Sequence, residues 1–548
     1  MPDTRGSKPA GRSGAGTGGI PAAPMLVLIM GTFMAMLDSS IVNVAIPRLM
    51  TIFQVTPTEI QWVMTIYLLV GGVVIPVTGY LGDRFGYKTL YMSALGVFTV
   101  ASLLCGLAWS NDSLVVARAL QALGGGMLLP LSMSMIYQLV PREKMGMALG
   151  LWGIAMTVAP ATGPTLGGYL VEYFNWHLIF LINLPVGIVT LALAQNVLSE
   201  TERKSGLKFD LPGFILCSAA CFTILLALSE GQSYGWGSQF IITLVVFSLF
   251  SFILFLIWEL HTEQPMLDVR LFQNAVLTLS VLSSSIAMIA MFSGIFLIPI
   301  FTQAVQGYTA LQTGLILMPA ALATGFMMPI TGKLFDRYGA APLAVTGLLV
   351  LVITTYLLHN LTIYTTIREI QFLLMLRGVG LGLCMMPLTT AGMNTVPQAL
   401  VGRASSMTNV FRQIAASLGI ALMTYVMTSR SIYHTATLSE GVSYSNVAAV
   451  EGLRMVERGL AAGGADAVSA KAGTLGVAMG AVQQQSFVLA ISDSFVVATG
   501  IIILAIPLAA FLTRSRIEAA RQTAELRLRE QGSTPGIRPS GLPAHVTD

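Results

Sequence analysis

Long apolar segments recur along nearly the whole chain, separated by short polar ones that hold most of the charged residues. A helix needs about 20 apolar residues to cross the hydrocarbon core of a bilayer. By this length criterion the pattern predicts about fourteen spans, and therefore an all-α polytopic membrane protein. The approximate spans are 25–47, 60–80, 89–109, 113–137, 145–170, 178–197, 211–230, 238–260, 277–302, 311–332, 341–359, 370–392, 404–428 and 488–512.

The composition agrees with this pattern. Of the 548 residues, 55% are hydrophobic and only 10% are charged, whereas soluble domains contain about 25% charged residues. The formal net charge is +4, and the basic residues are spread between the apolar segments instead of forming one patch. This distribution argues against a nucleic-acid partner and makes membrane lipid the expected surroundings of the chain.

The positions of Lys and Arg predict which way the chain is inserted. An even number of spans puts both termini on the same side of the membrane. Basic residues gather in the two tails and in alternate connecting segments, and the opposite segments contain few of them. Because cytoplasmic segments are enriched in Lys and Arg, we expect a multi-pass protein of the cell inner (plasma) membrane with both termini in the cytoplasm.

An internal repeat predicts two similar helical bundles. The sequence GYLGDRFG at Gly79–Gly86 recurs as GKLFDRYG at Gly332–Gly339, and its glycines permit a tight turn. Transporters are often built from such repeats, with the substrate site at the interface between them. The expected parts are a disordered cytoplasmic N-terminus at 1–24, a six-helix bundle at 25–200, two inserted helices at 201–262, a second six-helix bundle at 263–512 with a long, partly helical outer loop at 429–487, and a cytoplasmic tail at 513–548.

One acid, Asp38, lies deep within the first apolar segment, between Met25 and Pro47. A charge at such depth costs about 2.5–3.5 kcal/mol on insertion scales, and intramembrane ionisable groups are functional by default. We therefore interpret Asp38 as a proton or cation site; an ion pair that only fixes helix packing is the alternative. Other acids of the apolar segments fall near span ends, where we expect water to reach them: Glu172, Glu230, Glu259 and Asp493.

Three arginines, Arg118, Arg377 and Arg412, are also placed inside spans. Arginine keeps its charge in proteins, so Arg118 must find an acid, a carbonyl group or water in the bundle interior. Burial favours the neutral form of a neighbouring acid, whereas the arginine favours the carboxylate. An acid balanced in this way can load and release a proton as its surroundings open to either side.

The chain lacks the motifs of a membrane enzyme or an ATP-driven pump. None of its five histidines forms an H-E-x-x-H motif, the usual zinc site of a protease helix. Gly332-Lys333 is followed by Leu334, where a phosphate-binding loop has Ser or Thr. We therefore expect no enzymatic activity, no ATP-driven pump, and neither a metal nor an organic cofactor.

Several stretches resemble motifs of the major facilitator superfamily. Gly79–Lys88 resembles its loop motif between the second and third spans, and Arg118–Gly126 its fourth-span motif. Gly163–Gly168 resembles the fifth-span motif of its antiporters. Leu37–Pro47 and Trp176–Gly187 are similar to the fourteen-span drug:proton antiporter family, the EmrB/QacA type. The long outer loop resembles that of the EmrB-like multidrug efflux permeases.

The resemblance implies a major facilitator fold of two six-helix bundles plus two inserted helices, and proton-coupled efflux of amphipathic drugs or toxic small molecules by alternating access. It places Asp38 and Arg118 in the path of proton coupling. Asn43, Gln121 and Arg412 are candidates for a methionine- and aromatic-lined cavity that takes amphipathic, often cationic or apolar substrates. The antiporter motif is Gly163, Pro164, Gly167 and Gly168, and the implied inner gate comprises Gly79, Asp83, Arg84, Gly86, Lys88, Gly332, Asp336, Arg337 and Gly339. The second copy of the gate motif lacks a lysine two positions after its last glycine, so we expect a weaker charge network there.

The implied partners are a small-molecule substrate, protons and membrane lipid. If the host has two membranes, a periplasmic adaptor docked on 429–487 and an outer-membrane duct are also expected. A dedicated exporter of one metabolite or peptide, with the same proton coupling, stays open as an alternative. A non-transporting sensor or scaffold is a third hypothesis. Asp38, Arg118 and the two gate loops argue against it, because a scaffold needs none of them.

Overall fold

The structure of the chain is a computed structural model that describes residues 21–532, except 142–143, 202, 204–205, 207 and 442–446. Every regular element in this part of the chain is a helix, and 14 spans are long and apolar enough to cross a membrane. The predictions of an all-α fold and of about fourteen spans are therefore confirmed. Most of the N-terminal segment predicted to be disordered, and the end of the tail, lie outside the described residues.

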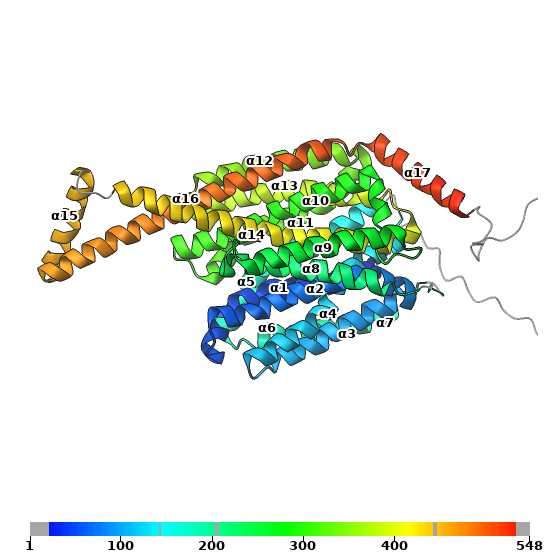
Figure 1. The fold of residues 1–548 in the computed structure, drawn as a ribbon, viewed down its shortest axis with the longest axis horizontal. Coiled ribbons are helices and arrows are strands. Elements are labelled where there is room, and N and C mark those ends of the chain that lie inside the picture. Colours follow the sequence, from blue (N-terminus) through cyan, green and yellow to red (C-terminus); the bar gives the residue numbers. More distant parts are fainter. Residues whose placement is uncertain are drawn as a thin grey trace, which may run out of the picture.

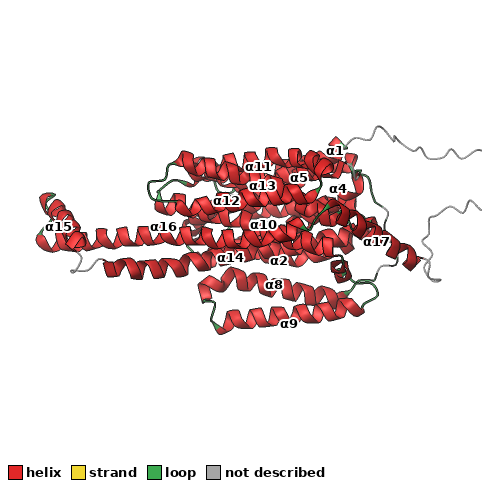
Figure 2. Ribbon diagram, turned by 90° about the horizontal axis from the view of Figure 1, so that it is seen from above, coloured by secondary structure: helices red, strands yellow, loops and turns green. Residues whose placement is uncertain are grey.

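Two bundles of helices lie side by side (Figure 1), with the insert at one edge, beside α2 and α14 (Figure 2). The first bundle consists of α1 (Ala22–Phe53), α2 (Pro57–Phe85), α3 (Tyr87–Gly106), α4 (Asn111–Leu139), α5 (Met145–Tyr173) and one span shared by α6 (Leu178–Leu181) and α7 (Asn183–Val197). The insert is α8 (Leu211–Tyr234) and α9 (Gln239–His261). The second bundle consists of α10 (Ala275–Ile300), α11 (Ala310–Tyr338), α12 (Ala340–Leu357), α13 (Ile367–Met393), α14 (Val401–Gly441) and α16 (Ala467–Ala510), followed by α17 (Arg514–Gly532).

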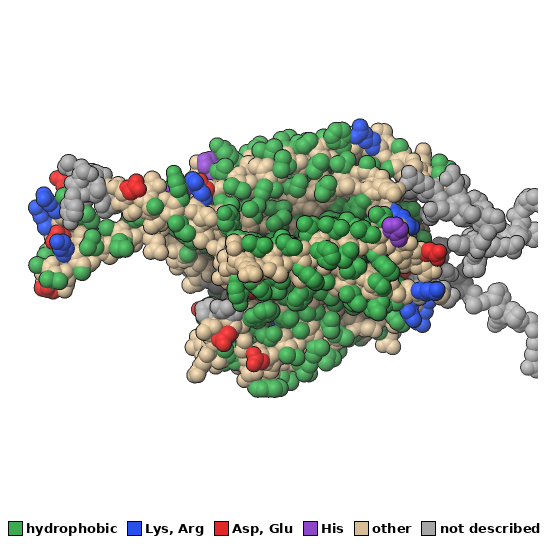
Figure 3. Space-filling view, viewed as in Figure 1, with side chains coloured by type: hydrophobic (Ala, Val, Ile, Leu, Met, Phe, Trp, Pro, Cys, Tyr) green, Lys and Arg blue, Asp and Glu red, His purple; other side chains and the backbone are tan. Residues whose placement is uncertain are grey.

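The two ends of the helical body carry different elements. The start of α1 and the end of α16 lie at one end, which we call the terminal face (Figure 1). The opposite end carries α15 (Val447–Ala462) on a long helical projection, and we call it the arm face. A belt of hydrophobic side chains covers the body between the faces, with the charged side chains gathered toward the ends (Figure 3). This pattern fits a protein that crosses a bilayer several times.

The two bundles repeat each other in the way their helices begin and end. Four helices, α2, α4, α11 and α13, each start with a capping box at the arm face, which satisfies backbone N–H groups of the first turn. Helices α2 and α11 both end at a glycine with positive φ, 91° at Gly86 and 82° at Gly339. Glycine adopts this conformation without steric cost, so the next helix begins one residue later. The tight turn predicted for the repeated motif occurs at both copies.

The segment 429–487, predicted as a long and partly helical outer loop, is more helical than predicted, because helices cover most of its described residues. Helices α14 and α16 contain 41 and 44 residues, or about 60–66 Å at 1.5 Å per residue, against a hydrocarbon core of about 30 Å. Both helices therefore continue past the membrane, and α15 packs on the projecting half of α16 (Figure 2). The segment is rich in alanine, which has the strongest intrinsic helix propensity, so its Gly- and Ser-containing composition did not prevent helix formation. We call residues 429–487 the arm.

Candidate functional site

The charged group at the centre of the first bundle is an ion pair between Asp38 of α1 and Arg118 of α4. Both side chains are buried, with 0% and 1% of their surface exposed, and Arg118 Nη1 lies 2.5 Å from Asp38 Oδ2. The guanidinium also donates to Gln121 Oε1 at 2.7 Å and, through Nε, to the backbone oxygen of Val63 at 3.3 Å. Its face lies 4.2 Å from the centre of the Tyr67 ring, within the range of a cation–π contact.

The second carboxylate oxygen of Asp38 accepts two amide hydrogen bonds. Gln121 Nε2 donates to Asp38 Oδ1 at 2.9 Å, and Asn183 Nδ2 of α7 donates to the same atom at 2.8 Å. Gln121 also donates to Ser102 Oγ of α3 at 2.6 Å. Helices α1, α4 and α7 therefore meet at one carboxylate whose oxygens both have donors, and α3 joins them through Ser102. We call Asp38, Arg118, Gln121, Asn183 and Ser102 the Asp38 cluster.

The Asp38 cluster contains more residues than the sequence predicted. Asp38 and Arg118 were identified as interior charges, and Gln121 as a candidate cavity residue. Gln121 in fact points to Asp38 and is fully buried. Asn183 and Ser102 were not predicted, although Asn183 lies in the Trp176–Gly187 stretch that carried part of the resemblance. Its position within the sixth predicted span was a second signal for a polar contact.

The second bundle repeats the arginine but not the acid. Arg377 of α13 is buried and donates to the backbone oxygen of Ala290, to Ser293 Oγ at 3.3 Å and, through Nε, to Thr355 Oγ1 at 3.4 Å. No carboxylate among the described residues forms an ion pair with it. A carbonyl and two hydroxyls thus take the place of Asp38. Among the described residues, the core of the first bundle contains a buried acid in an ion pair, and the core of the second bundle does not.

The glycines of the Gly163–Gly168 stretch let α5 approach the helix that carries Asp38. A side chain at Gly163 would overlap Ser40 Oγ, and a Cβ at Gly167 would lie 2.8 Å from the backbone oxygen of Ile41. Pro164 lies inside α5, which stays helical through it. Gly168 faces the other way, toward the backbone of Leu311 at the start of α11. The motif therefore packs against both the Asp38 helix and the second bundle.

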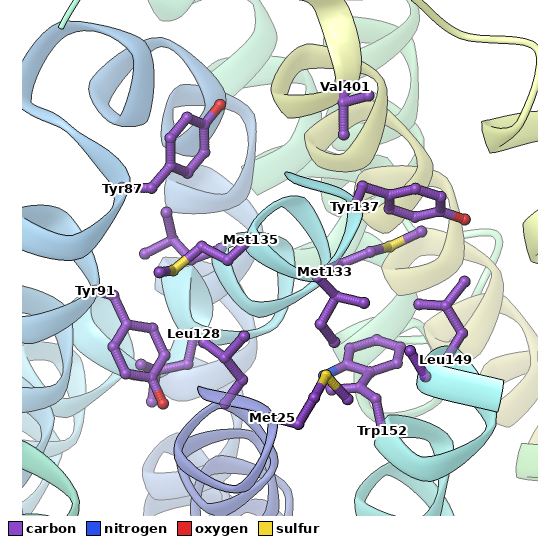
Figure 4. Packing of buried hydrophobic residues seen from close by; sticks show 14 of the residues in the cluster. Met25, Tyr87, Tyr91, Leu128, Met133, Met135, Tyr137, Leu149, Trp152 and Val401 are labelled. Atoms are coloured by element: carbon purple, nitrogen blue, oxygen red, sulfur yellow. The ribbon is translucent and has the colours of Figure 1, made fainter. Parts of the chain in front are cut away.

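The two bundles are in close backbone contact near the terminal face. A Cβ at Gly79 of α2 would lie 2.8 Å from the backbone oxygen of Gly402 in α14, and one at Gly146 of α5 would lie 2.6 Å from that of Gly332 in α11. Side chains of the two bundles share one apolar cluster here, in which Val401 of α14 lies with Tyr137 of α4 (Figure 4). These contacts join the two bundles directly at this face, beside a cavity of about 360 Å³ that Tyr137 and Val401 also line.

The charged residues of the repeated motif behave differently in its two copies. Asp83 is buried and accepts from Tyr87 Oη at 3.2 Å, while Arg84 Nη1 donates to Tyr80 Oη at 2.7 Å. Lys88 Nζ donates to the backbone oxygen of Gln195 at 2.7 Å. In the second copy, Asp336 and Arg337 are exposed and neither forms an ion pair with a described residue.

Glu230 and Glu259 do not follow the prediction that water reaches them. Glu230 is 4% exposed and Glu259 is 0% exposed. Residues after α9 fold back over the helix end, and the backbone N–H of Leu267 donates to Glu259 Oε1 at 3.1 Å, while Oε2 has no hydrogen-bond partner among the described residues. Position along a span predicts depth but not whether a later segment covers the side chain.

A small cavity lies between the bundles and contains Arg412 of α14. The lining includes five methionines and Trp152, and the indole N–H of Trp152 is already bonded to Thr32 Oγ1 at 3.0 Å. Asn43, the other candidate cavity residue, is exposed on α1 and does not line this cavity. The described residues contain no group of three or more His, Cys, Asp or Glu side chains that could hold a metal ion.

Comparison with known proteins gives a consistent set of relatives. A family model described as "Major Facilitator Superfamily" matches residues 28–420. The chain is 38% identical to the uncharacterized MFS-type transporter YhcA of Bacillus subtilis, over 77% of the chain and 80% of the relative. It is 34% identical to the probable multidrug resistance protein EmrY of Escherichia coli, over 77% and 84%. It is 33% identical to the lincomycin resistance protein LmrB of Bacillus subtilis, over 74% and 85%.

A solved structure supports the fold independently. The chain superposes, with a TM-score of 0.53, on an inward-facing bacterial homologue of the human lysosomal transporter Spinster. The match covers 92% of this chain and 99% of that one, at 15% sequence identity. At this identity the likeness concerns the fold alone.

Proposed function

Because the chain belongs to the major facilitator superfamily, and is thus a membrane transporter and not an enzyme, we propose that it exports amphipathic small molecules in exchange for protons. The Asp38 cluster carries this proposal, because it holds a protonatable group in a bundle core at 0% exposure against a permanent cation. A group at such depth that only fixed the packing would not need a charge. The relatives named for multidrug and lincomycin resistance support efflux of drugs, and so a contribution to antibiotic resistance.

The coupling step follows from the hydrogen bonds of Asp38. A proton that binds the carboxylate removes the negative charge facing Arg118 and replaces an acceptor with a donor. At least one of the contacts from Arg118, Gln121 and Asn183 must then break. These contacts join α1 to α4 and α7, so protonation loosens the packing of α1 and favours a different arrangement of the bundles. The gradient supplies the proton, and no cofactor takes part.

We further propose that the terminal face is cytoplasmic and that the membrane is the cell inner membrane. The excess of Lys and Arg in the segments on this side supports the orientation. The close backbone contact between Gly79 and Gly402 is then part of the inner gate. The substrate enters from the cytoplasm when this gate opens, and leaves at the arm face as the proton enters there.

The arm suggests a protein partner for hosts with two membranes. It projects beyond the membrane and exposes apolar side chains, among them Val468 at 77% and Met479 at 71%. We propose that a periplasmic adaptor, connected to an outer-membrane duct, docks on it in such hosts. A dedicated exporter of one metabolite or peptide would use the same parts, and a panel of unrelated substrates separates it from a multidrug exporter.

Reconstituted vesicles test the proposed function. The purified full-length protein is placed in liposomes with an imposed pH gradient, and uptake of ethidium, lincomycin and 2-naphthoate is followed together with internal pH. Gradient-driven uptake that causes proton movement, and that an uncoupler abolishes, is the expected result. Transport that persists unchanged with the uncoupler would refute proton coupling.

A further inference from the structure

Arg412 is a buried cation that lacks a counter-charge. It is 6% exposed, and no carboxylate among the described residues forms an ion pair with it. Its Nε has no hydrogen-bond partner there, and its Nη2 reaches only the sulfur of Met288 at 3.7 Å. A thioether is a weak acceptor, so the guanidinium keeps most of its hydrogen-bonding capacity unused. An unpaired buried charge is among the most costly groups in a protein.

The surroundings of Arg412 form a cavity shared by the two bundles. Helix α5 of the first bundle supplies one wall, and α10, α11, α13 and α14 of the second supply the rest. The hydroxyl of Thr390, at 0% exposure, also lines the cavity. The apolar part of the lining consists of Leu149, Trp152, Met156, Met291, Met328, Met385 and Met386. An unpaired guanidinium and a hydroxyl group thus share a cavity with flexible apolar side chains.

The other buried charge of the second bundle has the same sign. Arg377 is bonded to a carbonyl and hydroxyls and not to an acid. In the first bundle, by contrast, Arg118 is neutralised by Asp38. The described core of the second bundle therefore carries two uncompensated positive charges, which attract an anion and repel a cation in a medium of low dielectric constant.

We propose that this cavity is the substrate site and that its ligand is an amphipathic organic anion, such as an aromatic carboxylate. The carboxylate pairs with Arg412 and accepts from Thr390, and the rings lie among the methionines, whose unbranched chains adapt to varied shapes. The cavity now holds about 30 Å³, room for about one water molecule, so the ligand enters as the bundles move apart. This inference rests on the proposed transport function, and it replaces the expectation of cationic substrates.

A matched pair of ligands with one ring system tests the charge preference. Binding of 2-naphthoate and of 2-naphthylmethylammonium to the purified full-length protein in lipid nanodiscs is measured by calorimetry at pH 7, without any gradient. The naphthoate should bind more tightly than the ammonium ion. Arg412→Gln should weaken naphthoate binding by about 10- to 100-fold, because it removes a charge-assisted hydrogen bond. The same substitution should not weaken binding of the ammonium ion.

Two further variants control for folding and for charge in general. Arg412→Lys should keep the preference for the anion. Arg430→Gln, on the same helix but paired with Asp493 at the arm face, should leave naphthoate binding unchanged. The proposal would be overturned if the unmodified protein bound the ammonium ion more tightly than naphthoate. It would also be overturned if the affinity of Arg412→Gln for naphthoate were within about threefold of that of the unmodified protein.

The binding experiment and the vesicle experiment distinguish failure of the anion site from failure of the transport function. Proton-coupled export of ethidium without naphthoate binding would refute the anion site and leave the transport function standing. Naphthoate binding that requires Arg412, in a protein that moves none of the three probes, would refute the transport function instead.

Discussion

Replacing Asp38 by Asn is the most informative single change, because its cost can be worked out atom by atom. The carboxylate offers two acceptors, Oδ2 to Arg118 and Oδ1 to both Gln121 and Asn183. An asparagine amide turns one of these acceptors into a donor. Its NH₂ group then faces either the guanidinium or two amide NH₂ groups. Rotating the Gln121 amide does not help, since its Oε1 already accepts from Arg118.

The variant therefore loses a counter-ion and gains an unfavourable contact between donors. Breaking a buried ion pair by removing one partner costs about 3–5 kcal/mol, because the remaining charge is left unpaired. We expect Asp38→Asn to lower thermal stability in detergent and to abolish gradient-driven efflux and substrate-induced proton release. Loss of transport alone would not separate a coupling defect from a folding defect.

The double variant Asp38→Asn with Arg118→Gln makes that separation. It removes both charges, and replacing a complete buried pair by neutral groups is often close to neutral for stability. We expect it to be up to about 3 kcal/mol more stable than Asp38→Asn alone, yet equally unable to drive uphill efflux. Arg118→Lys should be nearly as damaging as Asp38→Asn, because an ammonium group does not reproduce the guanidinium fork, whereas Asp38→Glu should keep some activity. Uphill efflux by the double variant that collapses with an uncoupler would show that the proton is carried elsewhere.

Four further changes test other parts of the molecule. Asp83→Asn should slow transport while membrane abundance stays normal, and an unchanged initial rate would remove Asp83 from the gate. Gly79→Ala should separate α2 from α14 and favour opening at the terminal face, seen as longer distances between spin labels there; Gly96→Ala, where a Cβ meets nothing within 4 Å, is the control and should not change them. Glu259→Gln keeps an acceptor for the backbone amide of Leu267 and should retain uphill efflux. Loss of uphill efflux in this variant would reveal a second proton carrier. Replacing residues 442–482 by a short Gly-Ser linker should reduce resistance in cells with two membranes and spare transport in vesicles, and equal loss in both would indicate a role in folding.

The spans, the repeated motif and the interior charges can all be predicted from the sequence. Span length follows from the thickness of the bilayer, and a charge such as Asp38 within an apolar segment is visible without knowing its neighbours. The repeated glycines likewise predicted turns at Gly86 and Gly339, because a positive φ is a local requirement. These features depend on residues close together in the chain, and local composition is enough to read them.

Which side chains meet depends on the packing of the helices and could not be predicted from the sequence. Asn183 reaches Asp38 from a helix 145 positions away, and Arg118 is neutralised while Arg412 is not, although both are arginines in apolar spans. Glu259 is covered by a segment that folds back after its own helix, and the arm is helical because α14 and α16 continue past the membrane. In each case the partner of a side chain depends on how helices pack against one another, a long-range property that the order of residues within a span does not contain.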